Sequence, residues 1–120
     1  LASLFRFPVP ADFGIKDKRL RTFITCALAV PGAISAPVAT PGVAVLERQR
    51  LVNAVLPDLA KINLPVLMLH PREDDYADLS NAAYLQKALR GPVDLVVLED
   101  SYHLITVDRQ RNEVLERTLD

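Results

Sequence analysis

Two groups of residues capable of acid–base chemistry lie about 30 residues apart in the second half of the chain. His103 occurs in the stretch SYHLITVDRQ, directly after an apolar run. The earlier stretch LMLHPREDDYADLS ends another apolar run with four acids, Glu73, Asp74, Asp75 and Asp78. A carboxylate that binds one ring nitrogen of histidine fixes its tautomer and stabilises its cation, so that the other nitrogen can deprotonate a hydroxyl nucleophile. The two groups would form part of a Ser–His–acid arrangement if the fold brings them together.

The surrounding pattern predicts alternating strands and helices. The apolar runs PVLMLH and VDLVVLED are typical of buried strands. Each is followed by a stretch with helical spacing, so the expected order is strand 65–70, helix 80–90, strand 93–100 and helix 107–120. Strand, helix and strand at these lengths predict parallel pairing with a right-handed crossover. The fold class is therefore α/β.

Cap and stop residues give the expected bounds of the two helices. Asp78 or Ser80 is the expected N-cap of the first helix and Gly91 its stop signal. Thr106 is the expected N-cap of the second helix, whose apolar face we expect to comprise Val107, Val114 and Leu115.

Parallel pairing has a direct consequence for the candidate site. Asp74 lies just beyond the first strand and His103 just beyond the second. Neighbouring parallel strands are about 4.8 Å apart and end at the same edge of the sheet, so we expect the two side chains to meet there. Two buried strands need further strands beside them, so we expect this sheet to be incomplete and its remaining strands to lie upstream.

The first half of the chain has a different character. Residues 1–62 hold six of the nine prolines, and helical stretches are expected within 16–30 and 42–62. The stretch PGAISAPVATPG between them predicts a loop, and no strand is expected in this half. Amphipathic helices joined by proline-rich loops can cover the mouth of an active site, so residues 1–62 read as a cap or lid and 63–120 as part of the core.

Composition excludes several classes of protein. The chain has 120 residues, half of them hydrophobic, and a formal net charge of −1, which argues against nucleic acid as a partner. No apolar stretch reaches the roughly 18 residues that a bilayer span needs. Cys26 is the single cysteine, so no internal disulfide can form; we expect it to be a buried thiol and the protein to be cytoplasmic.

Chain order limits where a nucleophile could lie. No serine follows His103, so only the order nucleophile, acid, histidine remains, which is the order of the α/β-hydrolase fold. None of the four serines lies in G-x-S-x-G, and none both follows a buried strand and opens a helix, as a nucleophile elbow requires; they are Ser3, Ser35, Ser80 and Ser101. We therefore expect the nucleophile to lie upstream of this chain.

Residues 62–120 resemble the C-terminal part of bacterial α/β hydrolases of the carboxylesterase and monoacylglycerol-lipase type. The family's H-x-R-x-D motif is matched by residues 70–74, and its S-x-H-x-x-T-x-D motif by residues 101–108. The resemblance implies that Asp74 is the catalytic acid, rather than Glu73 or Asp75, and that His103 is the catalytic base. Residues 1–61 are similar to the family's cap insertion and its return to the sheet.

The resemblance further implies a serine hydrolase that cleaves carboxylic esters, with a small ester or a monoacylglycerol as substrate and no cofactor. The elbow serine, the oxyanion-hole loop and the strands before the cap are absent from these 120 residues, so we expect the chain alone to be inactive.

Two other interpretations stay open on sequence grounds. The acids at 73–78 could bind Mg²⁺, and His70, Asp74 and His103 could bind zinc. A non-catalytic α/β-hydrolase-like interaction module would keep the fold without the nucleophile. Beside these, His70 is expected to make a structural hydrogen bond and Arg72 to pair with a nearby acid.

Overall fold

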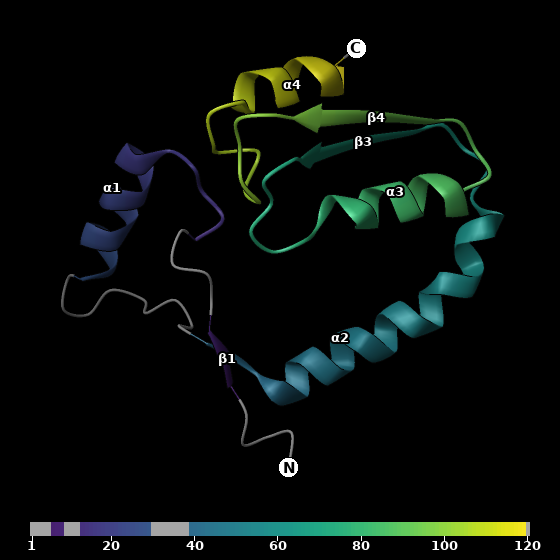
Figure 1. Cartoon of the computed structure of the whole chain (residues 1–120), viewed down its shortest axis with the longest axis horizontal. Helices are drawn as coiled ribbons and strands as arrows, with labels where there is room; N and C mark the ends of the chain where they lie inside the picture. The colour runs from purple at the N-terminus through teal and green to yellow at the C-terminus, as the bar shows by residue number, and fades with distance from the viewer. Residues whose placement is uncertain (1–5, 9–12, 30–38, 120) are drawn as a thin grey trace.

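The protein is a mixed α/β structure built around a parallel pair of strands. A computed structural model describes residues 6–8, 13–29 and 39–119, with only the backbone of residues 6–8 and 39. Strands β3 (Val66–Pro71) and β4 (Val93–Leu98) pair in parallel, from Val66 opposite Val93 to Pro71 opposite Leu98. Helix α3 (Leu79–Ala88) connects them. The expected strand–helix–strand unit is confirmed, and both strands end at the same edge (Figure 1).

The core of the described chain is small. In Figure 1 the strand pair lies between α3 and helix α4 (Arg111–Leu119). The buried apolar residues are few: Ile15, Ala82, Leu98 and Val114. Among the described residues the sheet of β3 and β4 has only these two strands. The strand pair therefore has unpaired edges within the described chain.

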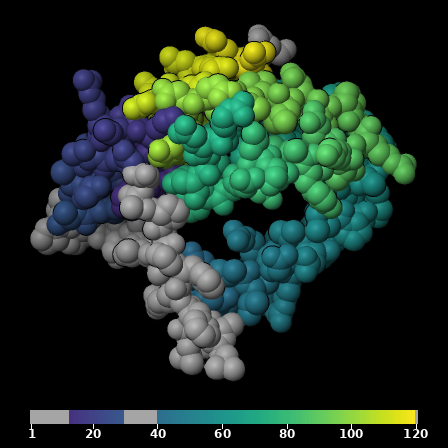
Figure 2. All heavy atoms as spheres, in the orientation of Figure 1, coloured from purple at the N-terminus to yellow at the C-terminus, as the bar shows by residue number. Residues whose placement is uncertain are grey.

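The first half contains two helices that bury little surface. Helix α1 (Lys18–Leu28) has no buried residue, and α2 (Gly42–Val55) buries only Gly42 before continuing as the 3₁₀ helix η2 (Leu56–Lys61). Cys26 on α1 is exposed, so the expectation of a buried thiol is wrong. Five large apolar residues of α2 are exposed: Val43, Leu46, Leu51, Val52 and Val55. Figure 2 shows open space between α2 and the part of the molecule that contains α3.

The expectation that this half contains no strand is also wrong. Strand β1 (Arg6–Pro8) pairs antiparallel with β2 (Ala39–Pro41), which lies at the end of the stretch expected to be a loop. The rest of that loop, residues 30–38, lies outside the described residues. Three-residue strands are too short to show an alternating pattern, and each of these ends in a proline, which has no N–H to donate.

Helix α4 begins at Arg111, four residues later than expected. The amides of Val107 and Asp108 both donate to the Leu104 carbonyl, 3.1 Å away, so this stretch forms turns instead of the first turn of a helix. Thr106 is therefore not the N-cap. Val114 is buried, but Val107 and Leu115 are exposed, so the expected apolar face is reduced to one residue.

Helix α3 ends before its expected stop signal. Asp78 is its N-cap, as expected, and accepts a hydrogen bond from the Ser80 amide. The helix ends at Ala88, and Gly91 lies beyond it. A Cβ at Gly91 would lie 2.1 Å from the Leu64 carbonyl oxygen. Close approach of two backbone segments, and not a left-handed cap, therefore explains this glycine.

Candidate active site

The loops after β3 and β4 bring Asp74 and His103 into contact. The Nδ1 atom of His103 lies 3.0 Å from Oδ2 and 3.1 Å from Oδ1 of Asp74. The Asp74 side chain is 3% exposed, whereas that of His103 is 43% exposed. Nε2 of His103 has no hydrogen-bond partner among the described residues. The ring thus has one nitrogen held by a carboxylate and the other available to a reacting group.

Asp74 is held by its own loop. Its Oδ1 accepts hydrogen bonds from the amides of Tyr76 and Ala77, both at 2.8 Å. Burial by itself raises the pKa of the Asp74 carboxyl, but the hydrogen bonds from His103 and from these two amides outweigh it and hold the pKa below its usual value. Asp74 is therefore a fixed anion at neutral pH, which suits a group that orients and stabilises an imidazolium.

Two neighbours of Asp74 complete the surroundings of the histidine. The ring of Tyr76 lies 4.8 Å from that of His103, at an interplanar angle of 34°. Burial, and then the charge of Asp75, raise the pKa of Tyr76, so its hydroxyl stays neutral. Asp75 accepts a long hydrogen bond, 3.4 Å, from the His103 amide. These contacts limit the positions that the ring and its backbone can take.

The two other motif residues singled out in the sequence have structural partners. Nδ1 of His70 lies 2.8 Å from the Pro71 carbonyl oxygen, and its Nε2 lies 3.9 Å from Asp74. Arg72 makes two hydrogen bonds to Glu99, at 2.6 and 2.7 Å. The expected hydrogen bond of His70 and ion pair of Arg72 are both observed, and the second ties the loop after β3 to the end of β4.

The acidic group does not form a shared metal site in the described chain. Its carboxylates have different partners: Glu73 binds Lys16, Asp75 binds backbone amides, and Asp78 caps α3. Across the described ranges, no three side chains of His, Cys, Asp or Glu are grouped so that they could hold a metal ion. The geometry expected for the magnesium and zinc interpretations is therefore not found in this part of the chain.

The described serines are not placed as nucleophiles. Ser101 is fully buried and its Oγ accepts a hydrogen bond from the Gln110 amide, and Ser80 lies in the first turn of α3. Ser3 and Ser35 lie outside the described residues.

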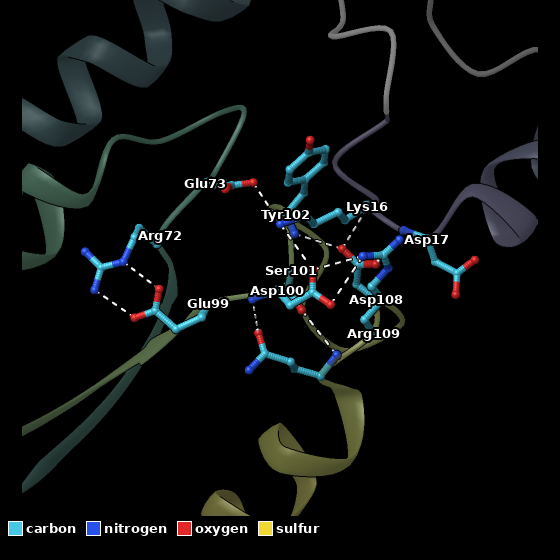
Figure 3. Close-up of polar contacts among 11 residues, drawn as sticks. Lys16, Asp17, Arg72, Glu73, Glu99, Asp100, Ser101, Tyr102, Asp108 and Arg109 are labelled. Carbon is cyan, nitrogen blue, oxygen red and sulfur yellow. Dashed lines mark hydrogen bonds and ion pairs between the residues drawn. The ribbon is translucent and has the colours of Figure 1, made fainter.

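Sequence reasoning missed several residues that organise the site. Asp108 is fully buried, although the motif containing it had given it no role. Burial raises the pKa of its carboxyl, but hydrogen bonds from the amides of Tyr102, Lys16, Asp17 and Arg109 outweigh burial and lower the pKa. Figure 3 shows this convergence of segments distant in sequence. Its partners are backbone amides, two of them more than 90 residues distant in sequence, so nothing beyond its place in the motif pointed to this role.

Comparison with known proteins gives limited information. No protein-family model matches the chain. A stretch of 52 residues, 43% of this chain, is 35% identical to "Uncharacterized protein YqkD" of Bacillus subtilis (strain 168). The match covers 17% of the length of that protein, whose name states no activity. In the described residues, no helix is long and apolar enough to cross a membrane.

Proposed function

We propose that this chain is the C-terminal part of an α/β hydrolase that cleaves carboxylic esters. In this proposal Asp74 and His103 are two members of a catalytic triad, and the serine lies on a segment outside these 120 residues. We call the polypeptide that contains both the parent hydrolase. The observation that carries the proposal is the contact of His103 Nδ1 with the Asp74 carboxylate, which accepts its hydrogen bond and leaves Nε2 available.

The arrangement supports a defined sequence of proton transfers. Nε2 of His103 takes the proton of the serine hydroxyl as its oxygen bonds to the ester carbonyl carbon. The imidazolium then gives this proton to the departing alkoxide, which leaves as the alcohol and breaks the ester bond. A water molecule, deprotonated in the same way, releases the acid and restores the serine. Asp74 stays ionised and stabilises the imidazolium in both steps.

Two features support a place within a larger hydrolase. Two apolar residues at the start of β3 are exposed: Leu67, 40% exposed, and Leu64, 74% exposed and just before the strand. Helix α2 likewise exposes five large apolar side chains. Further strands beside β3 or β4 would cover the first set. The second set, on a cap, would suit an ester with an apolar acyl group, such as a monoacylglycerol.

The test is ester hydrolysis by the parent hydrolase with substitutions at the pair. We expect His103→Ala and Asp74→Asn each to lower kcat on the order of 10⁴-fold, because one removes the base and the other the group that fixes its tautomer. Asp78→Asn is the matched control: it makes the same chemical change four residues from Asp74, and asparagine still caps a helix.

Each outcome has a distinct meaning. Equal activity of Asp74→Asn and Asp78→Asn would contradict the triad. Activity that needs added Mg²⁺ or Zn²⁺ and disappears with a chelator would favour the metal interpretation. A stable fold with no hydrolysis in any variant, the wild type included, would favour a non-catalytic interaction module.

A further inference from the structure

A short segment before α1 lies against both loops of the candidate site. Residues 14–17, here called the clamp segment, are more than 50 residues distant in sequence from either loop. The Gly14 amide donates to Asp75 at 3.1 Å, and its carbonyl accepts from the Leu104 amide at 2.7 Å. One residue of the first half thus binds the residue after the proposed acid and the residue after the proposed base.

The clamp segment is anchored by a buried carboxylate. Asp108 accepts the amide of Lys16 at 2.7 Å and that of Asp17 at 2.9 Å. The same carboxylate accepts the Tyr102 amide at 2.8 Å, one residue before His103. Ile15, between Gly14 and Lys16, is 1% exposed. The anchor therefore joins the clamp segment to the backbone on the N-terminal side of His103, and Gly14 joins it on the C-terminal side.

The side chain of Lys16 adds a bridge between the two loops. Its Nζ lies 2.8 Å from Glu73 in the loop after β3 and 3.2 Å from Asp100 in the loop after β4. Figure 3 shows Lys16 between Glu73 and the group that contains Asp100 and Asp108. The clamp segment is consequently bound to each loop by at least one backbone and one side-chain contact.

We propose that the clamp segment, held by Asp108, positions His103 against Asp74, so that Asp108 and Gly14 are positioning residues of the site. This inference rests on the proposed function. His103 lies in a loop and is 43% exposed, so its own packing does not fix it. Bonds to the residues on either side of it restrict its backbone, and an error of about 1 Å in a catalytic group can lower the rate roughly 100-fold.

Two substitutions disturb the clamp segment in different ways. Asp108→Asn replaces one acceptor oxygen with an NH₂ group, which then faces a backbone N–H and cannot accept from it. Gly14→Ala adds a methyl group 3.0 Å from the Cβ of His103 and 3.3 Å from the Tyr76 ring, at a backbone φ of +71°. Asp108→Asn weakens the hydrogen bonds that hold the clamp segment. Gly14→Ala places a methyl group directly against the His103 side chain. Asp78→Asn again serves as the control.

The experiment is kinetic analysis of the parent hydrolase after titration of its active serine with a fluorophosphonate. Titration counts correctly folded sites, so a purely structural loss lowers the titrated fraction and leaves kcat per site unchanged. We expect both clamp variants to lose about 10- to 100-fold in kcat per titrated site with KM little changed. The His103 Nδ1 proton, followed by nuclear magnetic resonance, is the second readout and should be lost or broadened in both variants.

The two proposals can fail separately. If His103→Ala is inactive but both clamp variants keep wild-type kcat per titrated site, the positioning role of the clamp segment is refuted. The proposed catalytic triad is then unaffected. If His103→Ala is fully active, the triad is wrong, and the Nδ1 proton alone decides the clamp. Its persistence in both variants would overturn the positioning role, and its loss in both would support it.

Discussion

Replacing Asp108 with asparagine should reduce the stability of the fold by a pH-dependent amount. The carboxylate is fully buried and accepts the backbone N–H groups of Lys16, Asp17 and Tyr102, more than one residue away in sequence, at 2.7 to 2.9 Å. A hydrogen bond to a charged group contributes about 1.5–3 kcal/mol, and a neutral one about 1 kcal/mol. Asparagine keeps one oxygen, which can retain the Lys16 and Tyr102 bonds at neutral strength, and loses the Asp17 bond. The expected loss is therefore about 2.5–7 kcal/mol at neutral pH, a large share of the roughly 5–15 kcal/mol that stabilises a typical domain.

The pH dependence follows from the direction of the pKa shift. The amide hydrogen bonds hold the pKa of Asp108 below its usual value despite burial, so the unfolded chain binds its proton more readily than the folded chain does. The stabilisation is thus fully present above the unfolded pKa of about 4 and is lost as pH falls through the lower folded pKa. Asparagine does not titrate. The difference between wild type and variant should be constant from pH 7 to about pH 5 and should shrink below pH 4.

Reversible urea unfolding of the parent hydrolase, followed by circular dichroism between pH 7 and pH 3, measures this difference. Carboxylates that make no contact with the clamp segment or with the residues around His103, such as Asp78, titrate in both proteins and cancel. A difference that stays constant to pH 3, or that grows on acidification, would refute the assignment of Asp108 as a buried anion held by amides. Equal slopes against urea in both proteins are required for the comparison.

Two further outcomes are expected. Tyr76→Leu should lower kcat about 2- to 5-fold because it removes an aromatic ring that can stabilise the His103 imidazolium. Tyr76→Phe keeps the ring and should keep wild-type kcat. Equal kcat values for the two variants would contradict this role of the ring. Gly91→Ala should lower the free energy of unfolding by more than about 1 kcal/mol, because the added methyl group would lie 2.1 Å from the Leu64 carbonyl oxygen. Urea unfolding measures this loss. An unchanged unfolding midpoint would show that the backbone at Gly91 can shift without cost.

The strand pair could be predicted from the sequence because its signal is local. PVLMLH and VDLVVLED are mainly apolar runs separated by one helix, and strands joined by a connection of this kind pair in parallel. That pairing was enough to expect Asp74 and His103 at one edge, where they are found in contact. Their catalytic roles depend on a nucleophile that these residues do not supply, so they stay predictions.

The clamp segment could not be predicted because its partners are distant in sequence. Gly14 lies just before a stretch expected to be helical and Lys16 is the first residue of that stretch, and only the fold brings them to Asp75 and Asp108. The same cause displaced the start of α4: Asp108 is engaged by amides from another part of the chain, and the residues around it form turns. The strands β1 and β2 were missed for a related reason, since their pairing is long-range and only three residues long.

The most direct measurement of the site is the tautomer of neutral His103, from ¹⁵N nuclear magnetic resonance of the parent hydrolase and its Asp74→Asn variant. The account predicts a proton on Nδ1, hydrogen-bonded to Asp74, with Nε2 unprotonated and able to accept a proton from a hydroxyl. The Asp74→Asn variant should lose this preference. A proton on Nε2 in the wild type, or a tautomer that is the same in both proteins, would contradict it.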